Sequence, residues 1–560
     1  MCKEAISAIL LVVTVNVVTY GQVEEARQAM DRGDTVQAVT ILSDALASRP
    51  TPDAYLELGL AYVKLKEFQR AEDTLKEGSR RYPQDPRFQN QLADLFLENN
   101  DREAAKSELH DALAIDPNNN YASDLLATID MSAGEVQSAL RSWNKGGRPV
   151  INDILHNYYL KFGSWVVRDA VAFRPSGVLW YSQWKTTESR LLESDNFSNV
   201  GLEIEPTQVP DQYNAVVRTT TKMNRLSDIA FDLFKGWPIE TTYFNLWNIG
   251  NSGINFNNLY RWENGLRRVE SQLKVPIPVP GLMFLEAGGM WRFERWDLTT
   301  LRPQFQSEAR FDYKSIAPPM RIKIIPHYRV ELGAGFEYRD RNPKGTLPQL
   351  FVNQHKMGLF TASAGFRLID RRYQNRLLLE GFGARRSIVG DMQFAGGTVQ
   401  LDNRITLSKD TRTYLDWTLK AGNSSGQLPV EQYFTLGLDT LDTPTLNLLR
   451  AHTLARHGHY GNGPTGTDFA LVNSDIERRL ATIPFFNTFN IPFITVKWQA
   501  FFDGAKTWDR THIFEEGKLL LDMGGGVRIE TPTHALNLIY GRSLRDGNNV
   551  FYAYYERRLW

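Results

Sequence analysis

The stretch that decides the fold is ITVKWQAFFDGAKTW, residues 494–508. Apolar and polar side chains alternate along it, as in a β-strand with one apolar face and one polar face. Because an unpaired charge is costly to bury, Asp503 must either face water or meet a partner from a distant part of the chain. One face carries Ile494, Val496, Trp498, Ala500 and Phe502, and the other carries Thr495, Lys497, Gln499, Phe501 and Asp503.

Similar alternation continues through the larger, C-terminal part of the chain. Residues 283–294, 413–421 and 519–530 show it best, among about fifteen strand candidates. A soluble β-sandwich buries apolar faces between two sheets. In a membrane barrel, long strands point their apolar side chains to the lipid and their polar side chains into a water-filled lumen. Since bacterial barrels have an even number of strands, we predict a transmembrane antiparallel β-barrel of about 16 strands over residues 238–560. A large soluble all-β domain is the alternative.

The two ends of the chain fit an outer-membrane protein. Residues 1–21, MCKEAISAILLVVTVNVVTYG, combine Lys3, an apolar stretch and small residues before Gln22, which is typical of a secretory signal peptide. An N-terminal membrane anchor is the alternative, although the stretch is short for a span. The last residues, NVFYAYYERRLW (549–560), predict an aromatic-rich strand that ends in Trp560. Outer-membrane barrels commonly finish on an aromatic residue.

Composition argues against several other classes. The 560 residues include 64 basic and 64 acidic side chains, so the chain lacks the positive charge of a nucleic-acid-binding protein, and we expect no nucleic-acid partner. The single cysteine, Cys2, lies in the predicted signal peptide. We therefore expect neither a disulfide framework nor a cysteine metal site.

Residues 22–147 contain an internal repeat. Ala38, Ala71, Ala105 and Ala139 are spaced 33, 34 and 34 residues apart, and large apolar residues precede them at helical spacing. Small residues where two helices meet, at this period, resemble the tetratricopeptide repeat, so we expect three clear helical units and a degraded fourth. Such a solenoid offers a concave surface to a peptide or protein partner. The alternative is a passive spacer.

Residues 170–224 predict a small mixed α/β unit. We expect VLWYSQW (178–184) as a strand, TTESRLLESDNFSNVGLEIEPT (186–207) as a helix running into a strand, and YNAVVRTTTKM (213–223) as another strand. The helix–turn–strand phrase resembles a polypeptide-transport-associated (POTRA) domain, a periplasmic module that precedes certain outer-membrane barrels. This resemblance implies client binding by strand addition, with accessible strand edges near residues 178–184 and 213–221. An unrelated α/β linker is the alternative.

Four motifs carry a more specific resemblance. They are LLRAHTLARHGHYGNG (448–463), VNSDIERRL (472–480), AFFDGAKTW (500–508) and DMGGGVRIETP (522–532). Placed after a POTRA-like unit in a long barrel, they resemble the BamA/TamA superfamily, which includes the barrel-assembly proteins and the two-partner-secretion translocators. The resemblance implies a long extracellular loop that folds back into the lumen. An Arg-Gly-aromatic tripeptide at its tip meets an aspartate two strands later.

On this chain the resemblance makes Arg450 the loop arginine and Asp503 the receiving carboxylate of a lumen latch. An arginine can grip a carboxylate through two parallel hydrogen bonds, and the alternative is that both charges are solvated in a wet pore. Five strand candidates follow Arg450, as expected for a loop between strands eleven and twelve of sixteen. The other motif positions are Ala451 and His452 in the loop, and Glu477, Arg479 and Gly504 in the barrel.

The loop departs from the family pattern, because Ala451 and His452 replace the glycine and the aromatic residue. Alanine would be strained if the position needs φ > 0, so the loop conformation is left open. His452, His457 and His459 could bind a metal, but three histidines on a loop are more often only polar, and we expect none. Since neither a Ser-His-Asp arrangement nor a phosphate-binding loop is recognised, we expect no cofactor and no enzymatic activity.

We therefore expect a protein of the bacterial outer membrane whose N-terminal domains are periplasmic. It would assemble a client, an unfolded or partly folded polypeptide, into the membrane or translocate it across. Its expected partners are outer-membrane lipids, the client and a periplasmic partner at the repeats. The alternative is a porin or polysaccharide exporter with a repeat scaffold, which predicts an open lumen and no inward loop latch.

Overall fold

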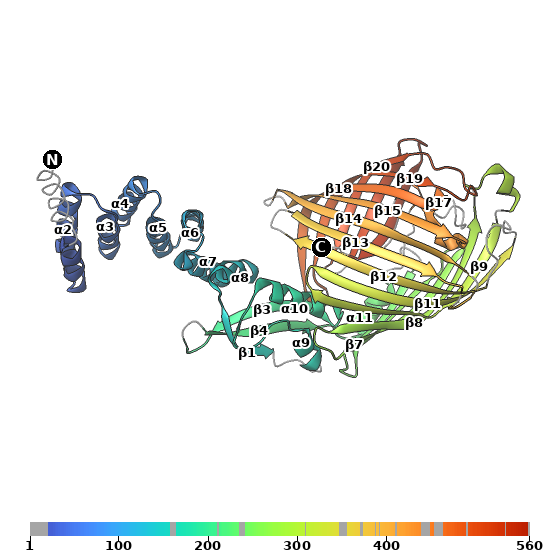
Figure 1. Ribbon diagram of the computed structural model, residues 1–560, viewed down its shortest axis with the longest axis horizontal. Coiled ribbons are helices and arrows are strands. Elements are labelled where there is room, and N and C mark those ends of the chain that lie inside the picture. The colour runs from blue at the N-terminus through green and yellow to red at the C-terminus, as the bar shows by residue number, and fades with distance from the viewer. Residues whose placement is uncertain are drawn as a thin grey trace, which may run out of the picture. The chain divides into compact units, whose positions relative to one another are not determined.

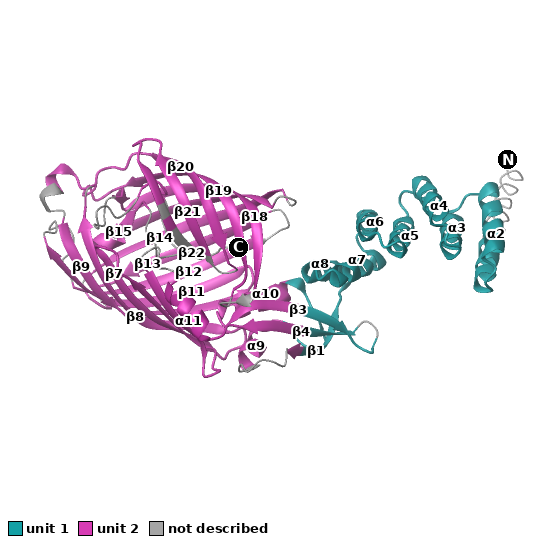
Figure 2. Ribbon diagram, turned by 180° about the vertical axis from the view of Figure 1, so that it is seen from behind, with its two compact units in different colours: residues 1–154, 173–181, 203–215 teal, residues 155–172, 182–202, 216–560 magenta. Residues whose placement is uncertain are grey.

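The chain divides into two compact units, one of residues 1–154, 173–181 and 203–215 and one of residues 155–172, 182–202 and 216–560 (Figure 2). The predicted signal peptide lies outside the described residues, apart from Gly21. The computed structural model describes residues 21–156, 164–209, 212–234, 241–298, 300–308, 310–345, 355–369, 373–386, 388–390, 392–408, 412–437, 449–452, 463–488, 491–531 and 534–557.

The N-terminal block consists of four helix pairs (Figure 1). The repeated alanines Ala38, Ala71, Ala105 and Ala139 are all fully buried where the second helix of each pair meets its neighbours. The first pair comprises the helical residues 21–31 and α2 (Thr35–Ser48), and the later pairs are α3 (Pro52–Lys64) with α4 (Phe68–Arg81), α5 (Arg87–Glu98) with α6 (Arg102–Ile115), and α7 (Asn120–Ser132) with α8 (Val136–Trp143).

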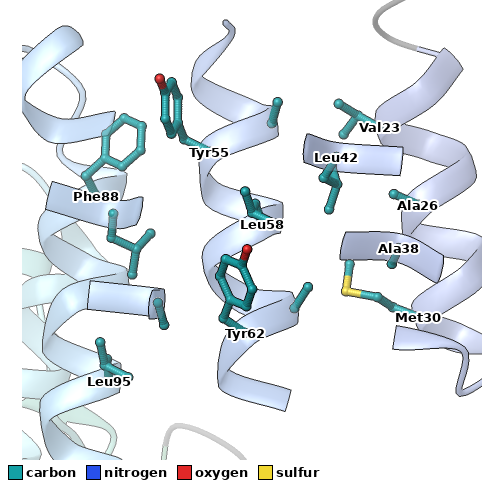
Figure 3. Packing of buried hydrophobic residues seen from close by; sticks show 14 of the residues in the cluster. Val23, Ala26, Met30, Ala38, Leu42, Tyr55, Leu58, Tyr62, Phe88 and Leu95 are labelled. Atoms are coloured by element: carbon teal, nitrogen blue, oxygen red, sulfur yellow. The ribbon is translucent and has the colours of Figure 1, made fainter. Parts of the chain in front are cut away.

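Glycines set the spacing between neighbouring helices of this block. A Cβ atom at Gly59 would stand 2.6 Å from Leu75 Cδ2, and one at Gly78 would stand 2.3 Å from Phe88 Cε1. Phe88 is fully buried in the same cluster as Tyr55, next to the leucines of α3 and α5 (Figure 3). Large side chains therefore fill the gaps that small residues leave, as the repeat pattern predicts.

A four-stranded sheet follows, in the order β2-β1-β4-β3. The predicted strand at residues 178–184 is wrong, because only Gly177–Val178 pairs and a helix begins at Tyr181. Trp184, Thr187 and Leu191 recur at helical spacing and are buried on one face, which favours the helix. The elements are β1 (Val150–His156), α9 (Ser164–Ala170), β2 (Gly177–Val178), α10 (Tyr181–Glu193), β3 (Phe197–Pro206) and β4 (Gln212–Thr221).

The expected strand edge at residues 213–221 is also wrong, because β4 lies between β1 and β3 and both of its sides are paired. The edges of this sheet are β3 and the two-residue β2. Only β3, with ten residues, is long enough to offer an incoming strand a row of backbone groups.

The rest of the second unit is an antiparallel sheet of sixteen strands that forms the barrel (Figure 1). Among the described residues, no helix is long and apolar enough to span a membrane. The strands are β5 (Thr241–Ile249), β6 (Ile254–Arg261), β7 (Leu266–Ile277), β8 (Met283–Asp297), β9 (Arg310–Ala317), β10 (Pro319–His327), β11 (Val330–Gly345), β12 (Lys356–Ile369), β13 (Tyr373–Ala384), β14 (Phe394–Ser408), β15 (Thr413–Gly426), β18 (Asp468–Thr488), β19 (Ile491–Trp508), β20 (Leu520–Glu530), β21 (His534–Ser543) and β22 (Asn549–Arg557).

The strands β9 and β10 are two segments that share one strand position in the sheet, and we call each such position a lane. Both pair with β8 on one side and β11 on the other. The break falls at Pro318 and Pro319, whose ring nitrogens cannot donate to the ladder. The sixteen strands therefore fill fifteen lanes, and the hydrogen-bonded order begins at β22 and ends at β5.

The two ends of the barrel differ in their connections. At one end, which we call the turn end, the connections after β5, β7, β10, β12, β14, β18 and β20 are at most five residues long. At the other, the loop end, the connections include residues 298–309, 346–355, 385–393, 427–467 and 509–519. Short turns at one end and long loops at the other are typical of outer-membrane barrels.

Helix α10 packs against the turn end. The Arg190 guanidinium donates to the carbonyl oxygens of Ile325 (2.9 Å) and Pro326 (3.2 Å), just before the β10–β11 turn. Lys274 Nζ donates to Glu193 Oε1 (3.0 Å) at the end of the helix. These contacts place α10 at the turn end of the barrel.

Candidate functional site

The site is built around a tight turn, residues 449–452, within the long β15–β18 loop. The His452 N–H donates to the Leu449 carbonyl oxygen (3.1 Å), which closes the turn. Leu449, Arg450 and Ala451 are buried. The loop therefore does not extend into solvent here but lies against the barrel wall.

Arg450 grips Asp503 with its side chain and its backbone. Its Nε donates to Asp503 Oδ2 (2.8 Å), its Nη2 to Oδ1 (2.5 Å), and its backbone N–H to Oδ2 (3.1 Å). Asp503 lies on the polar face of β19, five residues before its end and opposite Asp522, the third residue of β20. The turn therefore lies against the inner wall near the loop end of β20, and the two predicted residues are in direct contact.

Two further side chains complete the grip on this pair. Asn473 Nδ2 donates to Asp503 Oδ1 (2.7 Å), and Arg450 Nη1 donates to Asp475 Oδ1. Both residues come from β18, which pairs with β19 so that Asn473 lies opposite Asp503. Asp503 is fully buried, so the charge that the sequence placed on a polar face is neutralised by hydrogen bonds rather than by water.

The guanidinium of Arg450 also lies over an aromatic ring. Its Cζ is 3.9 Å from the centroid of Phe501, which is within the range of a cation–π contact. The ring in turn lies over Gly524, where a Cβ atom would come within 2.6 Å of Phe501 Cζ. Glycine in β20 thus clears the space in which Phe501 supports the arginine.

The carboxylate of Asp522 binds the second half of the turn, Ala451 and His452. The Ala451 N–H donates to Asp522 Oδ2 (2.7 Å), and His452 Nδ1 lies 3.0 Å from the same oxygen. Asp522 is paired with Asp503 across β19 and β20, and both are fully buried. Docking of the turn therefore brings donors to two neighbouring carboxylates that would otherwise repel each other.

His452 joins the wall to the last hairpin of the barrel. Its Nε2 lies 3.1 Å from Asp546 Oδ2, in the connection between β21 and β22. Burial lowers the pKa of His452, but hydrogen bonds and charge from Asp522 and Asp546 outweigh burial, so the pKa lies above its usual value. A protonated imidazole donates to both carboxylates at once, so the turn is held most firmly when His452 is charged.

The replacement of the family glycine by Ala451 does not strain the turn. Ala451 is not among the described residues with positive φ, so the position does not need glycine. The aromatic position is His452, which forms polar contacts instead. His457 and His459 lie outside the described residues, and within the described part of the chain no group of three or more metal-binding side chains is present.

The other predicted barrel residues lie away from the turn. Glu477 is buried in a charged cluster on the inner wall, where Lys497 Nζ (2.9 Å) and Arg404 Nη2 (3.2 Å) donate to its Oε2. Gly504 faces outward from β19, where a Cβ atom would come within 3.1 Å of Val472 Cγ1. Arg479 makes a long contact to Thr482 (3.4 Å) near the turn end of β18.

A cap spans the mouth of the barrel at the loop end. Leu301 and Phe514 form an antiparallel β-bridge, flanked by Arg302 N–H to Ile513 O (3.0 Å) and Glu515 N–H to Thr300 O (2.8 Å). The first loop follows β8 and the second follows β19, which are the twelfth and fourth of the fifteen lanes counted from β22. The two loops therefore come from opposite walls and join across the opening.

A third loop anchors the cap through a buried carboxylate. Glu431 accepts hydrogen bonds from Tyr313 Oη (3.2 Å) and Arg341 Nη2 (2.8 Å), while Tyr433 packs on Phe514 with ring centroids 5.1 Å apart. Burial raises the pKa of Glu431, but Arg341 and Arg339 outweigh burial, so the net pKa is lowered. The cap thus combines an apolar cluster with a charged anchor on the wall.

Sequence reasoning missed five parts of the site: Asn473, Asp475, Asp522, Phe501 and Asp546. The first four lie in the motifs that carry the superfamily resemblance, and Phe501 was already assigned to the polar face of its strand. The alternation identified this face, but it could not show which side chains the loop would reach. Asp546 lies in a short connection whose place beside the loop depends on the closed sheet.

The comparisons with known proteins concern the repeats and the barrel. Residues 29–95 and 86–119 match models of the tetratricopeptide repeat, and none of the curated proteins matches the chain. CdiB from Escherichia coli is similar over 73% of this chain and 76% of its own, with 12% identity and a TM-score of 0.50. CdiB from Acinetobacter baumannii covers 80% and 81% (12% identity, TM-score 0.47), and BamA from Haemophilus ducreyi lacking POTRA domains 1–3 covers 73% and 84% (11% identity, TM-score 0.43).

These findings confirm the fold that the sequence predicts. The N-terminal helices are tetratricopeptide repeats. The strands form a barrel of the same kind as that of CdiB from Escherichia coli. At this low identity the likeness concerns the fold, so function has to be argued from the residues of the lumen and the mouth.

Proposed function

We propose that this chain is a β-barrel protein of the bacterial outer membrane that inserts or assembles client polypeptides. The observation that carries the proposal is the docked turn, in which Arg450 grips Asp503 inside the lumen. A loop fixed by buried charges suits a barrel that switches between a closed and an open state, because a buried ion pair has to be broken as a unit.

The two ends of the barrel support an orientation. Outer-membrane barrels have short turns on the periplasmic side and long loops outside. The turn end is the one that α10 contacts through Arg190, so the repeats and the POTRA-like unit would lie in the periplasm. There the repeats would dock the client or a partner protein.

The mouth of the barrel favours insertion into the membrane over export across it. The loop end is spanned by the bridge between Leu301 and Phe514. In the described residues, the ladder ends at β5 and β22 without a pair between these two strands. Strand edges that lack a neighbouring strand are the ones that an incoming strand uses, so the client would leave through the wall rather than through the mouth.

The alternative of a porin or polysaccharide exporter predicted an open lumen and no inward latch. The docked turn and the bridged mouth both count against it. Single-channel recording separates the two, because an exporter would conduct at rest. We expect the closed barrel to conduct little until the cap or the turn is disturbed.

Reconstitution of the full chain in phosphatidylcholine vesicles tests the proposal. The probe is a small urea-unfolded β-barrel polypeptide, whose folding is followed as a heat-resistant band on gels. We expect the chain to accelerate this folding, and Arg450→Ala to lower the acceleration about tenfold or more, by the cost of unpairing buried charges. Arg479→Ala removes an arginine that lies away from the turn and should leave the rate unchanged. A rate equal to that of empty vesicles would refute the proposed function.

A further inference from the structure

In the described residues, the barrel has no strand between its end strands β5 and β22. β5 is followed by a turn at the turn end, so it runs from the loop end to the turn end. β22 follows a connection at the loop end and runs in the same direction. Neighbouring strands of an antiparallel barrel alternate in direction. Among the strands that the structure describes, one that runs from the turn end to the loop end is therefore missing between β5 and β22.

Helix α11 (Leu226–Phe234) runs in the direction of the missing lane. Before its first residue, Asn224 contacts Trp247 near the turn end of β5. At its other end, the Leu233 carbonyl oxygen accepts a hydrogen bond from Thr242 Oγ1 (2.9 Å), near the loop end. The helix therefore lies antiparallel to β5 along most of that strand.

Asn224 occupies the free edge of β5 as a neighbouring strand would. Its Nδ2 donates to the Trp247 carbonyl oxygen (2.7 Å), and the Trp247 N–H donates to its Oδ1 (2.8 Å). A carboxamide offers the same donor and acceptor as a peptide group, so it satisfies both backbone groups that face away from β6. The Lys222 ammonium lies 3.9 Å from the centroid of the Trp247 ring and adds a cation–π contact.

The faces of α11 suit a place in the barrel wall. Leu226, Leu233 and Phe234 are 86%, 36% and 66% exposed and share one face of the helix. On the opposite face, Asp232 Oδ2 accepts from Asn245 Nδ2 of β5 (2.9 Å), and Asp228 is buried. A helix on the surface of a soluble protein turns its apolar face inward and its polar face to water. The outward apolar face of α11 would instead be covered by the lipid around a barrel.

We propose that α11 is a helical plug of the barrel seam, which takes the sixteenth lane, covers the free edge of β5 and has to leave before a client strand can pair there. The inference rests on the proposed assembly function, in which a client strand joins the sheet. The contacts of Asn224 with the edge are solvent-exposed. An extended client can replace them with the same backbone hydrogen bonds, repeated along the whole strand.

A disulfide tether tests whether the plug has to leave. Leu233→Cys with Thr242→Cys joins α11 to β5, and the native Cys2 is replaced by serine. Thr242→Cys with Tyr260→Cys is the matched control, since these two residues are register partners on β5 and β6. With the unfolded barrel polypeptide as probe, the first tether should abolish accelerated folding until reductant is added, and the control tether should leave it intact. Full acceleration with the first tether closed would overturn the proposal.

Hydrogen exchange tests the covered edge without any client. In Asn224→Ala, the amide of Trp247 should exchange about tenfold faster or more, because its acceptor is lost. Asn224→Asp keeps an acceptor for this amide and should exchange near the wild-type rate. Unchanged exchange in Asn224→Ala would show that α11 does not cover the edge. If the wild-type chain fails to fold the probe, the assembly function is wrong, while tether formation and amide exchange still decide whether α11 plugs the seam.

Discussion

The carbonyl oxygen of Arg450 lies against Gly541 of β21, where a Cβ atom would stand 2.8 Å from it. Gly541→Ala should therefore push the turn off the wall without touching a charged group. Overpacking of this kind costs about 1–3 kcal/mol, which is roughly a 5- to 150-fold shift in docking. Tryptic cleavage after Arg450, which is 1% exposed in the docked state, should rise accordingly. Gly381→Ala is the control, because nothing lies within 4 Å of a Cβ atom there.

The hydrogen bonds to Asp503 predict that exchanging the two charges restores docking only in part. Asp503→Asn should free the turn, since removing one member of a buried ion pair costs about 3–5 kcal/mol. Arg450→Asp with Asp503→Arg should restore only part of this loss, because Asp503 also accepts from Asn473 and from the backbone of residue 450. Hydrogen exchange of residues 449–452 measures docking in both variants. Complete restoration by the swap would mean that the side-chain ion pair alone holds the turn.

The contacts of His452 make docking depend on pH. Its pKa is raised in the docked state, with hydrogen bonds to Asp522 and Asp546 outweighing burial. Because the pKa of His452 is higher in the docked state, protonation stabilises docking. The stabilisation is complete below the pKa of the undocked state and disappears as the pH rises through the pKa of the docked state. Tryptic cleavage after Arg450, normalised to a reference peptide, should therefore rise as the pH increases from about 6.5, the usual histidine pKa, through the higher pKa of the docked state. His452→Phe should remove the pH dependence, and His110→Gln on a distant helix should keep it.

The sequence predicted the local faces of the barrel better than its closure. Alternation in residues 494–508 placed Gln499, Phe501 and Asp503 on one face, and all three are buried, while Trp498 and Phe502 are exposed. Alternation is a property of each strand, so it needs no knowledge of neighbours. The seam could not be predicted in this way. It depends on the direction of β5 relative to β22 and on a helix that contributes no strand signal.

The errors in the α/β unit also concern features that depend on tertiary contacts rather than on the local sequence. VLWYSQW is rich in residues that favour strands, but Trp184 and Leu191 belong to one buried helical face that becomes clear only when the tertiary packing is known. The edge of the sheet depends on strand order, which the spacing of strand candidates does not encode. The repeats were predicted well because each unit packs only on its sequence neighbours.

The repeat block offers a coupled test of its packing. Gly78→Ala would place a Cβ atom 2.3 Å from Phe88 Cε1, and we expect a loss of about 1–3 kcal/mol in the stability of the block. Phe88→Leu alone should also destabilise, because it leaves a cavity. The double variant should lose less than the sum of the two, since the smaller leucine makes room for the new methyl. Hydrogen exchange of α4 and α5 in the full chain measures each; strict additivity would contradict the direct contact.

The cap provides the last prediction. Glu431→Gln removes the charge of the carboxylate that Arg341 and Tyr313 hold. This weakens the anchor of the cap and should open the mouth. Single-channel conductance should rise in this variant, and Glu515→Gln, an exposed residue of the cap, should stay near the wild type. Because the pKa of Glu431 is lowered in the closed cap, the ionised carboxylate stabilises this closed state. The stabilisation is complete above the pKa that Glu431 has in the open state and disappears as the pH falls through its pKa in the closed state. Acid should therefore open the cap while it secures His452 of the turn, and conductance that rises in acid even in Glu431→Gln would place the acid sensor elsewhere.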